Sequence, residues 1–269
     1  MPNPSAGDIA AALEAWADPA FAESYDNVGL HVGSTTHEVH STLVALDLTP
    51  AVVDEAEWLG VSMILTHHPL LFQPLRRVTD DDMIGNLVLR LVRLGIALYS
   101  IHTNLDAAPG GVSIELARIL GLNHTCFLCP RDESTCGLGA IGVLEPPMPL
   151  PDFVQHVSTC LEAPGLRYVG DPDATVCRVA VCGGSGSSLI QEALAAGVDT
   201  YVTADIKYHQ FFEVLDVRGT PRMALIDAGH YETEHHTEAL LCTWLQDRFP
   251  QVRFVRTSVK TSPVRTLMD

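Results

Sequence analysis

The sequence lacks a long apolar run, a basic leader and an excess of positive charge. None of its hydrophobic stretches approaches the roughly 20 residues that cross a bilayer, so we expect no membrane contact. The opening residues, MPNPSAGDIAAALEAWADP, show no basic segment followed by an apolar one, which argues against a secretory signal and favours a cytoplasmic protein. Sixteen basic against 33 acidic residues give a formal net charge of -17, which disfavours nucleic-acid binding because it repels a phosphate backbone.

Cysteine is also scarce. The seven cysteines are odd in number and sparse for 269 residues, which suits a reduced compartment better than a disulfide scaffold. Cys126 and Cys129 form a CxxC with Cys136 close behind, but no second pair follows to complete the four ligands of a structural zinc site. We therefore treat a zinc knuckle there as a minor alternative.

What is present is the pattern of an α/β protein. Apolar runs of strand length alternate with helical periodicity, and this βαβ rhythm is typical of a parallel sheet. We expect helices at 6–17, 50–60, 83–96 and 112–122, and strands at 41–49, 61–68 and 97–106. From about 125 to 165 the pattern loosens into turns and short strands, which places a lobe boundary near 125. The rhythm returns at 178–207 and 223–258.

Three segments place metal-ligand side chains at strand ends or helix starts, where an α/β fold gathers its site. In LTHHPLLF, His67 and His68 end an apolar run and Pro69 follows at once. In SIHTNLDAAPGG, His102 and Asp106 follow a strand. A third segment, DAGHYETEHH, has two pairs at i, i+4 spacing, so either His230 with Glu234 or Glu232 with His236 faces inward.

A lone histidine is more often a hydrogen-bonded core or surface residue than a ligand. The shared setting of all three segments nevertheless favours a metal site. Imidazoles mixed with carboxylates suit zinc, iron, manganese or nickel. Two such ions sharing a carboxylate activate water, which indicates hydrolytic chemistry.

A glycine loop in VCGGSGSSLI, with Gly184, Ser185 and Gly186, lies between a strand and a helix. It either binds an anionic group of a substrate or forms a tight structural turn. Asn27, in SYDNVGLHVGS, either belongs to a turn or places its amide beside the metal ligands. Lys207, in TADIKYHQ, is a candidate cation for a phosphorylated substrate.

Taken in order, YDNVGLHVG, LTHHPLLF, HTNLDAAPGG, CGGSGSSLI, TADIKYHQ and GHYETE resemble the motifs of the GTP cyclohydrolase I type 2 family, the Nif-three-like dinuclear metal proteins. The resemblance covers nearly the whole chain and implies a ligand set for two divalent ions: His67, His68, Asp106, His230 and Glu234. It also implies two α/β lobes with the metal cleft between them. Residues 1–124 and about 222–269 would form the first lobe and residues 125–221 the second, in the core form without an additional middle domain.

The resemblance further implies a toroidal homohexamer and a hydrolase that opens the guanine imidazole ring of GTP with release of formate. In that reading His102 transfers protons, and Asn27, Gly184, Ser185, Gly186 and Lys207 bind the small-molecule substrate. Two alternatives remain open: phosphoester hydrolysis at the same ions, and a non-catalytic metal-binding scaffold that partners recognise.

Overall fold

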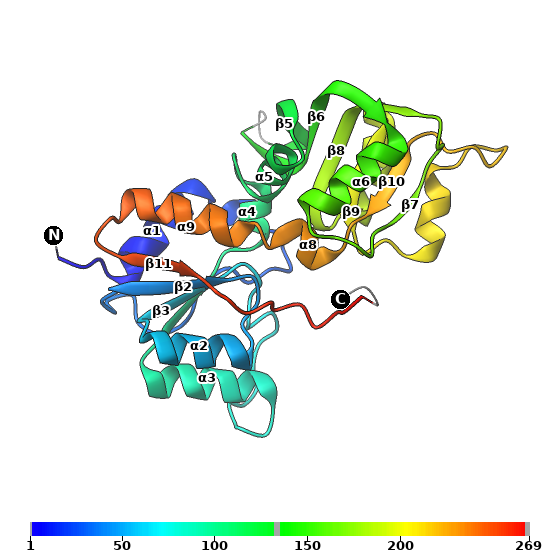
Figure 1. Ribbon diagram of the computed structural model, residues 1–269. Coiled ribbons are helices and arrows are strands. Elements are labelled where there is room, and N and C mark those ends of the chain that lie inside the picture. Colours follow the sequence, from blue (N-terminus) through cyan, green and yellow to red (C-terminus); the bar gives the residue numbers. More distant parts are fainter. Residues whose placement is uncertain (1, 132–134, 267–269) are drawn as a thin grey trace. The chain divides into compact units, whose positions relative to one another are not determined.

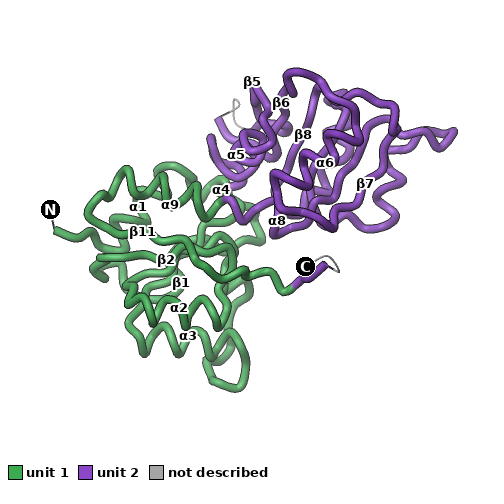
Figure 2. Tube along the Cα trace, in the orientation of Figure 1, with its two compact units in different colours: residues 1–105, 237–263 green, residues 106–236, 264–269 purple. Residues whose placement is uncertain are grey.

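The computed structural model describes residues 2–131 and 135–266 and divides into two compact units (Figure 2). Unit 1 comprises residues 1–105 and 237–263, and unit 2 comprises residues 106–236 and 264–269. Both units combine helices with a sheet, which confirms the expected α/β class. The chain passes from unit 1 to unit 2 within the short helix α4 (Thr103–Ala107).

Unit 1 is built on a five-stranded sheet whose strand order is β1-β4-β3-β2-β11. Its strands are β1 (Gly29–Val32), β2 (Ser41–Ala45), β3 (Met63–Thr66), β4 (Ala97–Ser100) and β11 (Arg253–Arg256). Four of them run parallel, and only β1 pairs antiparallel, with β4. The C-terminal strand β11 therefore completes the N-terminal sheet, pairing Arg253 with Ser41.

Helices cover both faces of this sheet, α2 and α3 on one side and α1 and α9 on the other (Figure 1). Their bounds are α1 (Ala6–Trp16), α2 (Pro50–Leu59), α3 (Met83–Leu94) and α9 (Thr237–Arg248), with a 3-10 turn η1 (Pro19–Phe21) after α1. Local sequence fixes their ends: the Thr49 side chain caps α2 by accepting from the Val52 amide, and Gly60 ends it at φ +62°. Burial of both sheet faces explains why its strands read as continuous apolar runs.

Unit 2 contains a six-stranded mixed sheet of order β5-β6-β8-β9-β10-β7. Its strands are β5 (Leu122–Arg131), β6 (Cys136–Pro149), β7 (Arg167–Val169), β8 (Thr175–Ser185), β9 (Thr200–Ala204) and β10 (Ala224–Asp227). Its helical elements are α5 (Val112–Ile119), α6 (Leu150–Cys160), η3 (Ser187–Leu189), α7 (Ile190–Ala196), η4 (Tyr208–Val214) and α8 (His230–Glu234). Only β8-β9 and β9-β10 pair in parallel.

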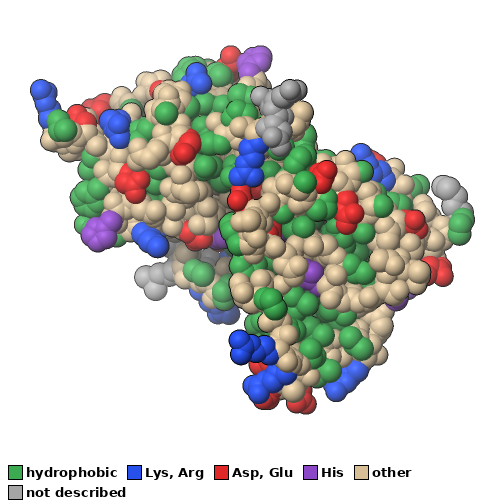
Figure 3. Space-filling view, turned by 180° about the vertical axis from the view of Figure 1, so that it is seen from behind, with side chains coloured by type: hydrophobic (Ala, Val, Ile, Leu, Met, Phe, Trp, Pro, Cys, Tyr) green, Lys and Arg blue, Asp and Glu red, His purple; other side chains and the backbone are tan. Residues whose placement is uncertain are grey.

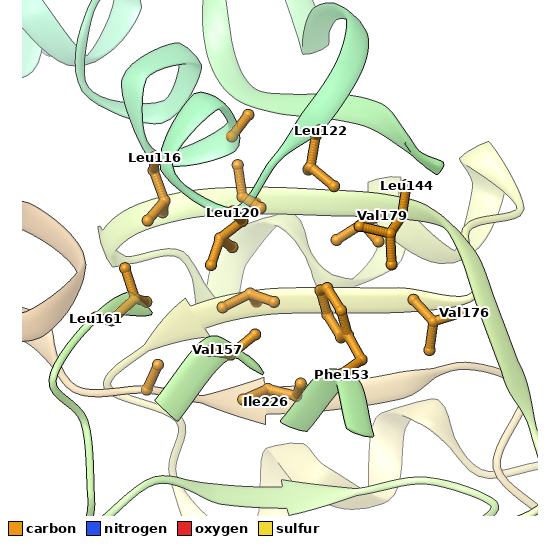
Figure 4. Packing of buried hydrophobic residues seen from close by; sticks show 14 of the residues in the cluster. Leu116, Leu120, Leu122, Leu144, Phe153, Val157, Leu161, Val176, Val179 and Ile226 are labelled. Carbon is orange, nitrogen blue, oxygen red and sulfur yellow. The ribbon is translucent and has the colours of Figure 1, made fainter. Parts of the chain in front are cut away.

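The core of unit 2 lies between its sheet and the helices α5 and α6 (Figure 4). Leu116 and Leu120 come from the α5 segment, Phe153 and Val157 from α6, and Ile226 from β10. All five side chains are buried. This cluster fixes α5 and the strands β8 and β10 to one another, and those strands precede the functional segments of unit 2.

Two expectations from the sequence need correction. Residues 125 to 165 do not form loose turns and short strands but two long antiparallel strands and helix α6. The prolines of β6 hid it, because they lie where its pairing with β8 shifts register, between Val143 and Met148. The division between units falls after Leu105 and after His236 rather than near 124 and 222, because α5 packs on β5, β6 and β8 and because β10 pairs with β9.

The cysteines are all free thiols. Cys126 and Cys129 lie three residues apart on the extended strand β5, so their side chains leave opposite faces of the sheet. No metal-ligand group within residues 2–131 and 135–266 includes a cysteine. In the same described ranges, no helix is both long and apolar enough to cross a membrane.

Basic side chains on the face shown in Figure 3 are scattered among acidic ones.

Candidate metal centre

Three histidines of unit 1 come together where two parallel strands end. His67 and His68 follow β3, and His102 follows β4. Their ring centroids lie 5.0 to 5.4 Å apart, and one ring nitrogen of each lies within 4.8 Å of the others. We call His67, His68 and His102 the histidine half-site.

Strand pairing persists up to these residues. The amides of His67 and His68 donate to the carbonyls of Ala45 and Leu46, at 3.2 and 2.9 Å. Pro69 then has no amide to continue the ladder. Both rings can approach one another because the chain leaves its extended course at this point.

Oxygen acceptors orient the two adjacent rings. Nδ1 of the fully buried His67 lies 2.8 Å from the carbonyl oxygen of Ile101, and Nδ1 of His68 lies 2.7 Å from Oδ1 of Asp47. A carbonyl or a carboxylate only accepts hydrogen bonds, so Nδ1 carries the proton in both rings. In the neutral rings the lone pair is then on Nε2, the arrangement that metal-binding histidines show.

His102 is held by a buried carboxylate. Its Nδ1 lies 2.8 Å from Oδ1 of Asp26, whose other oxygen accepts from both the backbone amide and the hydroxyl of Thr103. Burial alone would raise the pKa of Asp26, but the hydrogen bonds from His102 and Thr103 outweigh it and lower that pKa well below the usual range. Asp26 is therefore ionised and orients His102.

Asp47 is itself fixed by the C-terminal part of unit 1. The Thr261 hydroxyl donates to its Oδ2 at 2.7 Å. Next to it, buried Glu238 accepts from the Leu46 amide at 3.0 Å and lies 3.5 Å from Nε of Arg256. Burial, reinforced by the charge of Asp47, raises the pKa of Glu238 to about 7, although the Leu46 amide and Arg256 oppose the rise.

In unit 2, a histidine and two carboxylates gather around helix α8. His230 begins the helix and Glu234 ends it, so the two share a face, with His230 Nε2 3.0 Å from Glu234 Oε2. Nδ1 of His230 lies 2.7 Å from Oδ2 of Asp205, which follows β9. Burial alone would lower the pKa of His230, but hydrogen bonds and charges from Asp205 and Glu234 raise it to about 11.

Asp106 joins this group from helix α4. One of its carboxylate oxygens lies within 4.8 Å of a carboxylate oxygen of Glu234. We call Asp106, His230 and Glu234 the acidic half-site. The competing pair is not part of it: among the described residues, no metal-ligand group contains Glu232 or His236, and buried His236 bonds through Nε2 to the Val112 carbonyl at 3.2 Å.

The glycine loop brings bare backbone against the acidic half-site. A Cβ on Gly184, which has φ +59°, would lie 2.1 Å from Oε1 of Glu234 and 3.1 Å from Nε2 of His230. The amides of Gly183 and Gly184 donate to the hydroxyls of Ser113 and Thr233, at 3.4 and 3.0 Å. The backbone of this segment therefore packs directly against the Glu234 carboxylate, and its two amides are hydrogen-bonded within the protein.

The other binding residues predicted from the sequence are Asn27, Ser185, Gly186 and Lys207, and they lie on separate segments. The Asn27 side-chain amide donates to the Leu71 carbonyl at 2.5 Å, beside the histidine half-site. Ser185 ends β8, and the Gly186 carbonyl accepts from the Tyr201 hydroxyl at 2.8 Å. Lys207 is exposed and precedes η4. Their role toward a substrate stays a prediction.

Sequence reasoning missed Asp47 and Asp205, and it did not identify Asp26 as the partner of His102. A signal was present, because Asp205 directly follows a buried strand and Asp47 lies two residues beyond one, the same setting that singled out the histidines.

The donor chemistry of both half-sites fits a divalent transition metal. Oriented imidazoles and carboxylates, without thiolate, suit zinc, iron, manganese or nickel. The Gly184 position supports this fit, since any side chain there would overlap the Glu234 carboxylate. Histidines of unit 1 and histidine and carboxylate side chains of unit 2 are thus among the residues that could bind a metal.

The chain is similar to known proteins over most of its length. A family model described as Duf34/NIF3 (NGG1p interacting factor 3) matches residues 4–263. A "GTP cyclohydrolase 1 type 2 homolog" of Streptomyces coelicolor is 39% identical over 236 residues, covering 86% of this chain and 82% of that protein. A protein of the same name from Clostridium acetobutylicum is 34% identical and covers 84% of each chain.

Among solved structures, a hypothetical protein of Staphylococcus aureus superposes with a TM-score of 0.92 at 28% identity. The match covers 98% of this chain and 100% of that one. That protein therefore shares this chain's fold over nearly its full length.

Proposed function

The chain belongs to the Duf34/NIF3 family, and on this premise we propose that it is a dinuclear metal-dependent hydrolase. In this proposal the chain binds two divalent ions, and His67, His68, Asp106, His230 and Glu234 are the ligands. The observation that carries it is the orientation of His67, His68 and His230, each bound through Nδ1 to an oxygen acceptor. Bound ions of this kind activate water and stabilise developing negative charge.

The remaining work falls to the chain's own side chains. His102, backed by the ionised carboxylate of Asp26, accepts or delivers a proton at its Nε2, because Nδ1 is committed to that carboxylate. Asp47 and Asp205 keep the Nδ1 protons of His68 and His230 in place.

The substrate we propose is GTP or a related purine nucleotide, opened in its imidazole ring with loss of formate. Support comes from the names of the relatives, which are called GTP cyclohydrolase 1 type 2 homologs. The candidate residues for contacts with the nucleotide are Asn27, Gly184, Ser185, Gly186 and Lys207.

The proposed assembly is a toroidal homohexamer. Sedimentation of the purified protein measures the mass of the assembly directly.

Elemental analysis of the reconstituted protein tests the metal proposal. We expect two equivalents of metal per chain, and fewer than two in both His68→Ala and Glu234→Ala. The matched control is His209→Ala, which removes an exposed imidazole on η4, outside both half-sites, and should keep two equivalents. Fewer than one equivalent in the wild-type protein would refute the dinuclear centre.

Product identification tests the reaction. Metal-loaded protein incubated with GTP should release formate and a pterin, detected by chromatography, and His102→Ala should lower the rate while retaining metal. Inorganic phosphate or a nucleoside monophosphate in place of formate would assign phosphoester hydrolysis instead. Absence of any product, together with a partner lost in His68→Ala, would favour the scaffold.

A further inference from the structure

Two large aromatic side chains stand exposed beside the histidine half-site. Tyr25 is 62% exposed and Phe72 is 40% exposed. Their ring centroids lie 6.1 Å apart with the planes tilted by 49°. The Phe72 ring also lies edge-on to His102, with centroids 6.3 Å apart. The pair therefore borders the proposed site within unit 1 itself.

Both rings sit on backbone that the half-site fixes. Tyr25 immediately precedes Asp26, the carboxylate that holds His102. Phe72 follows Leu71, whose carbonyl accepts from the Asn27 side chain at 2.5 Å. Hydrogen bonds of the adjacent residues therefore connect the segment of Tyr25 to that of Phe72, through Asn27 and Leu71, and also to His102, through Asp26.

His31 reinforces this connection from the other side. Its Nε2 donates to the Asn27 carbonyl at 2.8 Å, because a carbonyl only accepts. Its Nδ1 then accepts from the Leu71 amide at 3.5 Å. The segments 25–31 and 69–72 are consequently bonded at Leu71 through both its amide and its carbonyl.

A packing role does not account for these rings. A core aromatic residue would be buried, as Tyr99 and Phe153 are, whereas Tyr25 and Phe72 keep much of their apolar surface in water. A tilted aromatic pair offers one face and one edge to a flat ring inserted beside it, the two contacts that aromatic rings prefer.

We propose that Tyr25 and Phe72 form a stacking platform for the planar heteroaromatic ring of the substrate, a purine or a ring of that class. The platform places the ring against His102, while any phosphate groups extend elsewhere. This inference rests on the proposed function and names the part of the substrate that unit 1 recognises.

Calorimetric titration with two probes tests the platform: guanosine, which has the ring without phosphate, and inorganic triphosphate, which has phosphate without the ring. Each is titrated into zinc-loaded protein. Removing one stacking partner of a base weakens binding by about tenfold. We therefore expect Phe72→Ala and Tyr25→Ala each to raise the guanosine Kd about tenfold, with the triphosphate Kd and the zinc content unchanged.

Two further variants make the result specific. Tyr25→Phe keeps the ring and should bind guanosine like the wild type. Trp58→Ala removes an aromatic side chain of α2 that is 83% exposed, and it should change neither Kd. An unchanged guanosine Kd in Phe72→Ala would overturn the platform, whether or not the sedimentation mass of that variant changes.

The proposed reaction can fail separately. If both alanine variants released formate from GTP with an unaltered KM, the platform would be refuted and the proposed cyclohydrolase reaction would be supported. Phe72-dependent guanosine binding without formate would keep the platform and remove that reaction.

Discussion

The two half-sites differ in how their ligands are satisfied. In unit 1, Nδ1 of each of the three imidazoles is bound by an oxygen acceptor that is not itself a proposed ligand. In unit 2, His230 lies between two carboxylates, and one of them, Glu234 at 3.0 Å, is a proposed ligand. The histidine half-site is therefore preorganised, whereas the acidic half-site would have to exchange an internal ion pair for a metal ion in the proposed centre.

The half-sites also share a structural feature, an aspartate that orients a histidine. An aspartate that follows a parallel strand, Asp47 beyond β2 and Asp205 after β9, binds Nδ1 of a proposed ligand at 2.7 Å. Carboxyl ends of parallel strands meet at one edge of a sheet, so each unit solves the same problem with its own sheet. The contrast lies in the ligands, and the common element lies in what orients them.

The largest expected effect comes from Gly184→Ala in the acidic half-site. Its Cβ would overlap Glu234 Oε1 at 2.1 Å, and φ +59° adds backbone strain. We expect a loss on the order of 2–4 kcal/mol in the free energy of unfolding, together with loss of bound metal. Urea unfolding and elemental analysis measure the two effects.

Gly197→Ala is the matched control for this substitution. Gly197 has φ +66°, and a Cβ added there would meet no atom within 4 Å, so only the strain of about 1–2 kcal/mol applies. Equal destabilisation and equal metal content in the two variants would show that the close approach to Glu234 has no role.

A smaller effect should follow from weakening the shared aspartates. Asp47→Asn and Asp205→Asn keep the size of the side chain but remove its charge, so each should lower metal affinity roughly 10- to 100-fold. Competition with a chromogenic chelator measures both. A loss in only one variant would mean that a single unit relies on this feature, which would break the parallel between the units.

The smallest expected effect is a pH dependence of the free energy of unfolding, which arises from Glu238 in unit 1. The pKa of Glu238 is raised from 4.5 to about 7, so between these values the unfolded chain releases a proton that the folded chain keeps. The free energy of unfolding should therefore fall as pH rises from about 4.5 to 7, with the full contribution present below that window.

Glu238→Gln removes this titration. In chelator-treated protein, the fall in unfolding free energy between pH 5 and 8 should shrink by roughly 1–2 kcal/mol relative to the wild type. An identical pH dependence in the two proteins would contradict a titrating Glu238.

The sequence was most informative where chemistry coincides with an element end. His67 and His68 beside Pro69 marked the end of β3, and the helical spacing of His230 and Glu234 placed them on one face. The βαβ rhythm likewise predicted the parallel part of unit 1, because burial on both sides leaves continuous apolar strands.

The partners of these ligands could not be read from the sequence. Asp47 lies 21 residues from His68 and Asp205 lies 25 residues from His230, and only the order of strands in each sheet brings them together. The prolines of β6 concealed a long strand for a similar reason, since its register shift depends on pairing with β8. Contacts between distant segments decide these features, and no local pattern records them.

The insertion of unit 2 between two parts of unit 1 sets an order for folding during synthesis. The strands of unit 2 emerge from the ribosome before β11 exists, and domains generally fold as their residues appear. Thr261, 214 residues beyond Asp47, emerges after all of these strands. The support of His68 is thus completed only after residues 106–236 of unit 2 have been made, whereas Asp205 meets His230 earlier. Translation therefore supplies the partners of His67, His102 and His230 before Thr261, the last group in the support of His68.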